Sequence, residues 1–246
     1  MKLPVMAGVI ERRLLVNYCV DADVAARLLP VPLRPQLVDG SAVAGICLIR
    51  LGHLRPRGLP PWMGLRSENA AHRVAVEWDT PDGVESGVYI PRRDTGAMVN
   101  AVIGGRLFPG EHHRASFRVD EHENRLAVAF ASRDGAARVD VRAELAESLE
   151  GSELFGNLDA ASQFFRTGSL GFSPRDSSAH LDGLELETPA WRVEPVTLLE
   201  ARSSFFEDPQ RFPPGSAKLD CALVMRHVLA RWIPRAAESR LATAAA

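Results

Sequence analysis

The sequence predicts a mainly β protein, an antiparallel barrel-like sheet with a few short helices. Two observations lead to this prediction. Apolar segments rich in β-branched residues recur along most of the chain, and turn signals rich in Gly, Pro, Asp and Asn separate them about every 8 to 12 residues. No repeat period, low-complexity block or change of composition divides the chain. We therefore expect one domain over residues 1–235, followed by a frayed C-terminal tail over 236–246.

In the first half of the chain, β-prone runs are joined by turns that contain proline or glycine. The expected strands are 13–20, 42–51, 67–78 and 84–90. Asp21 can cap a short helix over 22–29, because its side chain can accept from the first free N–H groups. Asp39-Gly40 is a strong two-residue hairpin signal. Gly45, inside the second long strand, indicates a bulge or the close approach of another backbone.

The second half continues the pattern up to a last apolar run. Further strands are expected at 115–119, 125–132, 137–145, 184–186, 191–193 and 196–205. Asp159 can cap a short helix that ends at Phe165, and 170–179 is expected to be a polar connection. The run 218–232 fits either a strand or a helix, and we favour the strand.

The composition argues against several classes of partner and cofactor. The net charge is −2, and no basic stripe is interleaved with aromatic residues, so neither nucleic acid nor a membrane is an expected partner. The three cysteines form no CxxC pair, which indicates separate buried thiols and a reducing, cytoplasmic location. Nucleotide-binding glycine loops, a hydrolase elbow and HExxH are all absent, so we expect no cofactor and no metal. Assembly into a homo-oligomer is left open.

The segment 88–117 contains the densest group of ionisable side chains, beside proline and glycine punctuation. Loops at strand ends are where a rigid scaffold usually presents its chemistry. The candidate ligand-binding residues are Tyr89, Arg93, Arg106 and His113, and the candidate catalytic residues are Glu68, Glu111 and His112. A solvated surface cluster is the plainer alternative for the charged members.

Glu68 and Arg106 have the most specific physical arguments. Glu68 belongs to a polar start of an otherwise apolar strand. A carboxyl group at a barrel mouth would have its pKa raised by desolvation and could serve as a general acid or base. An ion pair with an arginine is the structural alternative. Arg106 lies between Gly-Gly and Leu-Phe, where it could bind a ligand carboxylate bidentately, or instead brace Glu68 or Asp94.

Four segments of this chain, taken in order, resemble the acetoacetate decarboxylase-like superfamily, in particular its uncharacterised YqjF-like branch. They are RLLVNYCVDADVAARLLP at 13–30, DGSAVAGICLIRL at 39–51, IPRRDTG at 90–96 with GGRLFPGEHH at 104–113, and WRVEPVTLLEARSSFFEDPQRFPPG at 191–215. The resemblance implies a barrel-like β fold around an internal cavity. It also implies that the decarboxylases' Schiff-base lysine would fall in the 104–113 segment. This chain has Gly110 or Glu111 at that place.

The chain's lysines make an imine mechanism unexpected. Only two of the 29 basic residues are lysines, Lys2 and Lys218, and neither is near the 104–113 segment in sequence. We therefore expect a protein that binds a small carbonyl or carboxylate compound in an internal pocket. The alternative is an enzyme of lyase, isomerase or hydrolase type that uses Glu or His acid–base chemistry and Arg electrostatics without an imine. An interaction protein acting through the Trp62 loop is a third hypothesis.

Overall fold

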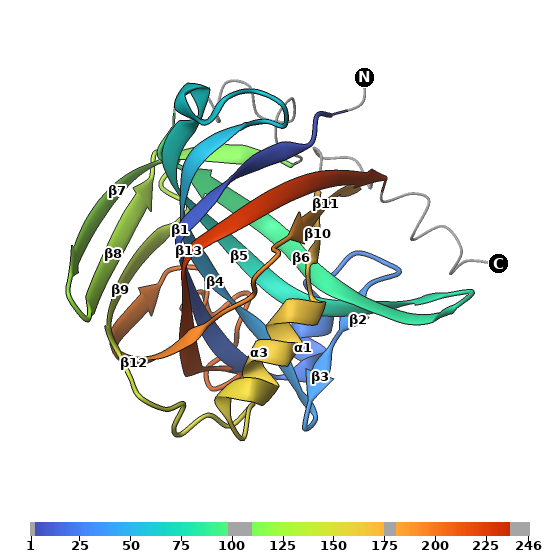
Figure 1. Cartoon of the computed structure of the whole chain (residues 1–246). Helices are drawn as coiled ribbons and strands as arrows, with labels where there is room; N and C mark the ends of the chain where they lie inside the picture. The colour runs from blue at the N-terminus through green and yellow to red at the C-terminus, as the bar shows by residue number, and fades with distance from the viewer. Residues whose placement is uncertain (1–2, 98–109, 175–180, 237–246) are drawn as a thin grey trace.

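The computed structural model describes residues 3–97, 110–174 and 181–236 (Figure 1). The predicted fold class is confirmed, because strands dominate these ranges and helices are few and short. In chain order, the elements are β1 (Met6–Val20), α1 (Ala22–Ala26), β2 (Arg34–Pro35), β3 (Leu37–Val38), β4 (Ser41–Pro56), the 3-10 turn η1 (Pro61–Met63), β5 (Leu65–Thr80), β6 (Gly83–Thr95), β7 (His112–His122), β8 (Arg125–Ser132), β9 (Arg138–Leu145), α3 (Leu158–Thr167), β10 (Leu170–Pro174), β11 (Leu181–Glu187), β12 (Glu194–Ser203) and β13 (Ala217–Ala236). None of these helices combines the length and hydropathy that crossing a membrane requires.

Strand pairing forms two rings that share a wall. One ring runs from β5 through β6, β7, β8, β9, β12, β13, β1 and β4 back to β5. A second circuit leaves β6 through β10 and β11 and reaches β13 directly. Most pairs are antiparallel, as predicted, but β6 pairs with both β7 and β10 in parallel. The strands β13, β1, β4, β5 and β6 belong to both rings, so their two faces look into different interiors.

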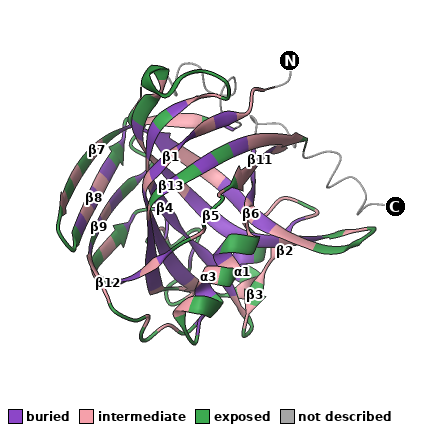
Figure 2. Ribbon diagram, viewed as in Figure 1, coloured by how far each residue is buried: buried purple, intermediate pink, exposed green. Residues whose placement is uncertain are grey.

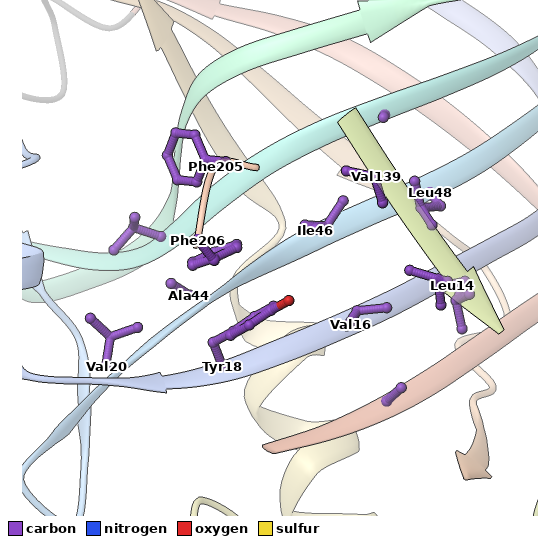
Figure 3. Close-up of a cluster of buried hydrophobic side chains, with 14 of the residues drawn as sticks. Leu14, Val16, Tyr18, Val20, Ala44, Ile46, Leu48, Val139, Phe205 and Phe206 are labelled. Carbon is purple, nitrogen blue, oxygen red and sulfur yellow. The ribbon is translucent and has the colours of Figure 1, made fainter. Parts of the chain in front are cut away.

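Each interior has its own apolar core, because successive side chains of a strand point to opposite faces. On β4, Ala44, Ile46 and Leu48 pack in the first core, whereas Cys47 and Leu51 belong to the second. Figure 3 shows the first core, where side chains of β1 and β4 meet Phe205 and Phe206 and where Tyr18 stacks on Phe206 at 4.0 Å. Figure 2 shows that buried residues are concentrated on the shared central strands.

Two local predictions are confirmed by backbone geometry. Asp39 and Gly40 have φ angles of 47° and 82°, as the tight hairpin between β3 and β4 requires. At Gly45, a Cβ atom would lie 2.3 Å from the carbonyl oxygen of Val16, which is the close backbone approach that the sequence indicated.

Several element predictions are corrected. Residues 170–174 form β10 rather than a polar connection, because Leu170 and Phe172 pack into the first core while their backbone pairs with β11. Residues 191–193 are not a strand. The helix before β10 begins two residues earlier than predicted, because Asn157 and not Asp159 is its N-cap, with its side chain accepting from the N–H of Ala160 at 2.9 Å. The last apolar run is a strand, as we favoured.

Candidate functional site

The second interior encloses a cavity of about 760 Å³. Its wall is formed by β1, β4, β5 and β6, and residues from α3, β7, β10, β11 and β13 complete it. Apolar side chains such as Ile49, Phe165, Leu184 and Trp232 supply much of the lining. This size and this mixture of apolar surface with a few polar groups are typical of small-molecule sites.

Strand register places polar side chains on this wall in adjacent rows. In one row, Cys47 of β4 is opposite Ala71 of β5, Ala71 is opposite Arg93 of β6, and Arg93 is paired with His112 of β7. All four residues line the cavity. Because Ala71 has only a methyl group, it leaves open space between the thiol and the guanidinium on either side of it.

Arg73 of β5 also lines the cavity, and it belongs to the neighbouring row that contains Asn17 of β1 and Gly45 of β4. Its Nη2 donates to the Oδ1 of Asn17 on β1, and its guanidinium lies 4.7 Å from the ring centre of Phe165. Gly45 lies between Asn17 and Arg73 in register, and a Cβ there would come within 3.3 Å of Nη2. The glycine therefore leaves the path that the long side chain follows across β4.

Arg73 is charged and deeply buried. The residue is 3% exposed, and its Nε has no hydrogen-bond partner among the described residues. Burial lowers the pKa of Arg73 to about 10, against an opposing effect of Cys47. That value is still far above neutral, so the guanidinium stays positive at pH 7.

Two more arginines face the same space. The Nε of Arg93 donates to the Oγ of Ser173 at 3.0 Å, and burial lowers the pKa of Arg93 to about 10. The Nε of Arg13 donates to the Sγ of Cys47 at 3.4 Å, and its guanidinium lies 5.9 Å from the ring centre of Trp191. Within the described part of the chain, none of Arg13, Arg73 and Arg93 forms an ion pair with a carboxylate.

Glu68 is not among the residues that line this cavity. It accepts from Nη2 of Arg12 at 2.6 Å and from Nε of Arg50. The same two arginines bind the carboxylate of Glu121, with Arg50 Nη1 at 2.9 Å from it. The geometry of Glu68 is thus the ion pair that the sequence left open as the alternative to catalysis.

The other predicted site residues are spread over several environments. His112 lines the cavity, Glu111 is exposed, and His113 has its Nδ1 3.2 Å from Asp134. Tyr89 packs in the first core, where burial raises its pKa. Arg106 lies outside the described residues. Of the predicted residues, the structure therefore brings Arg93 and His112 together at the cavity.

Sequence reasoning missed Arg13, Arg73 and Cys47 as site residues. The available signal was a polar or charged side chain inside an apolar β run, as in RLLVNYCV and HRVAVEW. Lys218 is exposed at the start of β13 and does not line the cavity, and Lys2 lies outside the described residues. The described residues contain no group of three or more His, Cys, Asp and Glu side chains placed to hold a metal ion.

Comparison with solved structures identifies the fold. An acetoacetate decarboxylase from Legionella pneumophila superposes with a TM-score of 0.60 at 10% identity, covering 94% of this chain and 86% of that one. An acetoacetate decarboxylase-like enzyme from Sphingomonas wittichii gives 0.61 at 12% identity, covering 96% and 92%. The enduracididine biosynthesis enzyme MppR, solved with pyruvate, gives 0.58 at 13% identity, covering 95% and 88%.

Comparison of sequences identifies the family. A search of curated proteins found no match. The family model DUF2071, described as an uncharacterized conserved protein, matches residues 9–226, which is most of the chain. The protein therefore belongs to the DUF2071 family and has an acetoacetate decarboxylase-like fold.

Proposed function

We propose that the cavity binds a small organic carboxylate, which Arg13, Arg73 and Arg93 hold. The observation that carries this proposal is that three guanidinium groups face one cavity and none of them forms an ion pair with a described carboxylate. Of the carboxylates in the lining, Asp94 pairs with Arg92, Glu185 pairs with Arg235, and Glu187 is exposed. Arginine does not lose its proton in proteins, so burial leaves an uncompensated positive charge. An entering carboxylate relieves that charge and can accept two parallel N–H groups from one guanidinium.

The rest of the lining fits the same class of ligand. Ile49, Phe165 and Trp232 offer apolar contacts to a hydrocarbon or carbonyl portion. A volume of about 760 Å³ accommodates compounds larger than pyruvate. The pyruvate that is bound in the MppR structure is a compound of this class, held by a protein of the same fold.

Thermal unfolding with and without ligands tests the proposal. Pyruvate and acetoacetate should raise the melting temperature of the wild type, because a ligand that binds only the folded state stabilises it by mass action. Methyl pyruvate, which has no negative charge, should not. Arg93→Met should abolish the response while the unliganded variant keeps or gains stability, because it loses a partly buried charge that has no carboxylate partner among the described residues. Arg125→Met is the matched control, since that side chain is 79% exposed.

Three results would contradict carboxylate binding. One is equal stabilisation by pyruvate and by its methyl ester, which would mean that the charge is not recognised. Another is an Arg93→Met variant that responds to pyruvate as the wild type does. Unchanged stability with every carboxylate tested would also count against it.

His112 supports a second candidate function, an enzyme that uses acid–base chemistry without an imine. His112 lines the cavity and is paired in register with Arg93. An imidazole there could take a proton from the carbon next to a carbonyl, while the electron pair moves to the carbonyl oxygen and a guanidinium stabilises the negative charge. The wild type should then exchange the methyl protons of pyruvate for deuterium in heavy water, followed by NMR, and His112→Gln should not. No exchange above the rate in buffer would exclude this function for pyruvate.

Three further expectations stay proposals. Imine formation is not expected, so borohydride added with acetoacetate should leave the intact mass unchanged. The three thiols are free, which fits a reducing, cytoplasmic location. Membership of the YqjF-like branch rests on the sequence resemblance alone.

A further inference from the structure

Cys47 occupies a distinctive place within the cavity. It lies on β4, opposite Leu15 on one side and Ala71 on the other. The residue is 7% exposed and lines the cavity. Its sulfur accepts from Arg13 Nε at 3.4 Å. Arg93 is two strands away in the same row, at a backbone separation of about 10 Å, which the spacing of neighbouring strands sets.

The surroundings of this sulfur favour a nucleophile. Reactive cysteines are found in electropositive, partly accessible surroundings, and here the Arg13 guanidinium donates to the sulfur while the residue lines the cavity. A second, independent feature points to a bound anion: Arg73, which lines the same cavity, is 3% exposed and has an Nε without a hydrogen-bond partner among the described residues. The arginines proposed to hold an anion and the thiol therefore line the same cavity.

The other two cysteines lack these surroundings. Cys19 and Cys221 are not among the residues that line the cavity. Burial raises the pKa of Cys221 to about 12, with Asp220 adding to the effect, and its Sγ accepts from Asn17 Nδ2 at 3.6 Å. Cys221 is therefore expected to be inert, and Cys19, which is half-buried, serves as an internal reference.

We propose that Cys47 is the nucleophile of the cavity, selective for short carboxylates whose electrophilic carbon adjoins the carboxylate, such as 2-oxo acids. The inference rests on the proposed function and extends it from binding to covalent capture. With a 2-oxo acid, the sulfur electron pair forms a C–S bond, and the C=O π pair moves to oxygen. The oxygen takes up the proton that the thiol releases. The product is a tetrahedral thiohemiketal, and its formation needs no oxidant or reductant.

Alkylation of the native full-length protein gives the first test. Iodoacetate carries a carboxylate and iodoacetamide does not; with either reagent a C–S bond forms, iodide leaves with the bonding pair and the thiol proton passes to solvent. Peptide mass spectrometry then yields the iodoacetate-to-iodoacetamide rate ratio at each cysteine. The ratio at Cys47 should exceed that at Cys19 by roughly ten- to a hundredfold, the factor that corresponds to a hydrogen bond to a charged group. Arg13→Met should bring the Cys47 ratio down towards the Cys19 ratio, and the exposed-site control Arg125→Met should leave it unchanged.

A second test follows the carbonyl carbon directly. Pyruvate labelled with carbon-13 at its second carbon is added at a concentration that raises the melting temperature. A tetrahedral carbon resonance distinct from that of pyruvate hydrate should appear with the wild type and with Cys19→Ala, and should be absent with Cys47→Ala. The Cys19→Ala variant shows whether loss of a thiol alone disturbs the protein.

The outcomes separate this inference from the proposed function. If pyruvate stabilises the wild type and Cys47→Ala alike while no tetrahedral resonance other than that of pyruvate hydrate appears, the nucleophile is overturned and the carboxylate pocket stands. An iodoacetate preference at Cys47 no greater than at Cys19 also overturns the nucleophile. If, in addition, no carboxylate raises the melting temperature, the proposed function fails with it.

Discussion

His72 is a buried basic residue that avoids the cost of a buried charge by staying neutral, which the cavity arginines cannot do. It is 0% exposed, its ring centre lies 4.5 Å from that of Phe205, and neither ring nitrogen has a hydrogen-bond partner among the described residues. Burial lowers its pKa to about 3, and the positive charges of Arg92 and Arg211 act in the same direction. An imidazole can become neutral when it is buried, whereas a guanidinium remains charged and requires an anion.

The neutral state of His72 predicts a pH dependence of stability. Its pKa is lower in the folded state than in the unfolded state, so the unfolded chain binds the proton more tightly. The contribution is fully present above about pH 6.5 and is lost towards about pH 3, at about 1.4 kcal/mol for each pH unit. Relative to His72→Phe, the wild type should therefore lose about 2 kcal/mol of unfolding free energy between about pH 7 and about pH 5.

Urea unfolding of both proteins across this pH range measures that difference. Comparing the two proteins cancels the titration of the acidic residues that they share. His122→Gln is the control, because the His122 side chain is 81% exposed and its loss should leave the pH dependence of the wild type almost unchanged. A gap between wild type and His72→Phe that does not vary with pH would show that His72 is protonated to the same extent in both states.

The cavity arginines explain why the sequence pointed to two of the polar residues that line the cavity but not to the others. Arg93 and His112 were found because ionisable residues cluster around them in the chain. Arg73 alternates with Val74 and Val76, a pattern that indicates a strand with one buried face and one face in water. The polar face instead looks into the cavity, because the second ring closes over it. Alternation separates the two faces of a strand, but it does not distinguish bulk water from an enclosed polar site.

At the scale of elements, an ion-pair cluster joins four strands. Arg12 of β1, Arg50 of β4 and Glu68 of β5 are neighbours in register, and Glu121 of β7 completes the cluster. The Arg12 side chain is 2% exposed and that of Glu68 is 19% exposed. The cluster therefore links the C-terminal end of β7 to the strands β1, β4 and β5 beside the first core.

Removing one charge from this cluster should be costly. Glu68→Gln leaves the buried Arg12 with less compensation and should lower the unfolding free energy by about 3–5 kcal/mol, as for other broken buried pairs. Glu144→Gln, in the exposed pair with Arg125, should cost no more than about 1 kcal/mol. Urea unfolding at neutral pH measures both values. The response to pyruvate should survive in Glu68→Gln, because Glu68 does not line the cavity. If Glu68→Gln keeps its stability but no longer responds to pyruvate, Glu68 acts in ligand binding and not as a stabilising ion pair.

Elements were predicted best where local chemistry decides them. The hairpin at Asp39-Gly40 follows from two residues that tolerate a positive φ, and the long strands follow from their apolar runs. β10 was missed, because SLGFSPRD gives a weak strand signal and its pairing comes from β6 and β11, which are far away in sequence. The segment 191–193 has a strand-like composition, but Trp191 is used instead to contact Ser162 on α3, with its Nε1 donating to Oγ at 2.9 Å.

At the scale of the whole molecule, the two rings share the strands β13, β1, β4, β5 and β6. One core cannot be exposed to water without exposing the opposite face of the same strands, and therefore the other core. Neighbouring residues on these strands pack into different cores; for example, Leu14 packs in the first core and Leu15 in the second. The shared wall thus predicts one cooperative unit, and the single domain expected from the sequence makes the same prediction.

Tryptophan fluorescence can test this cooperativity in each core separately. Trp78 is buried in the first core and Trp232 in the second. In two variants that each keep one of these tryptophans, with the others replaced by Phe, the fluorescence of each should report the same urea midpoint as far-UV circular dichroism of that variant, as a two-state transition requires. Because the variants differ in stability, each comparison is made within one protein.

A fluorescence midpoint for Trp232 well below the circular dichroism midpoint would show that the second ring opens first. The cavity would then be a locally unfolding unit on a stable first ring, and pyruvate should raise the Trp232 midpoint more than the circular dichroism midpoint. With a shared wall, we expect pyruvate to raise both by the same amount.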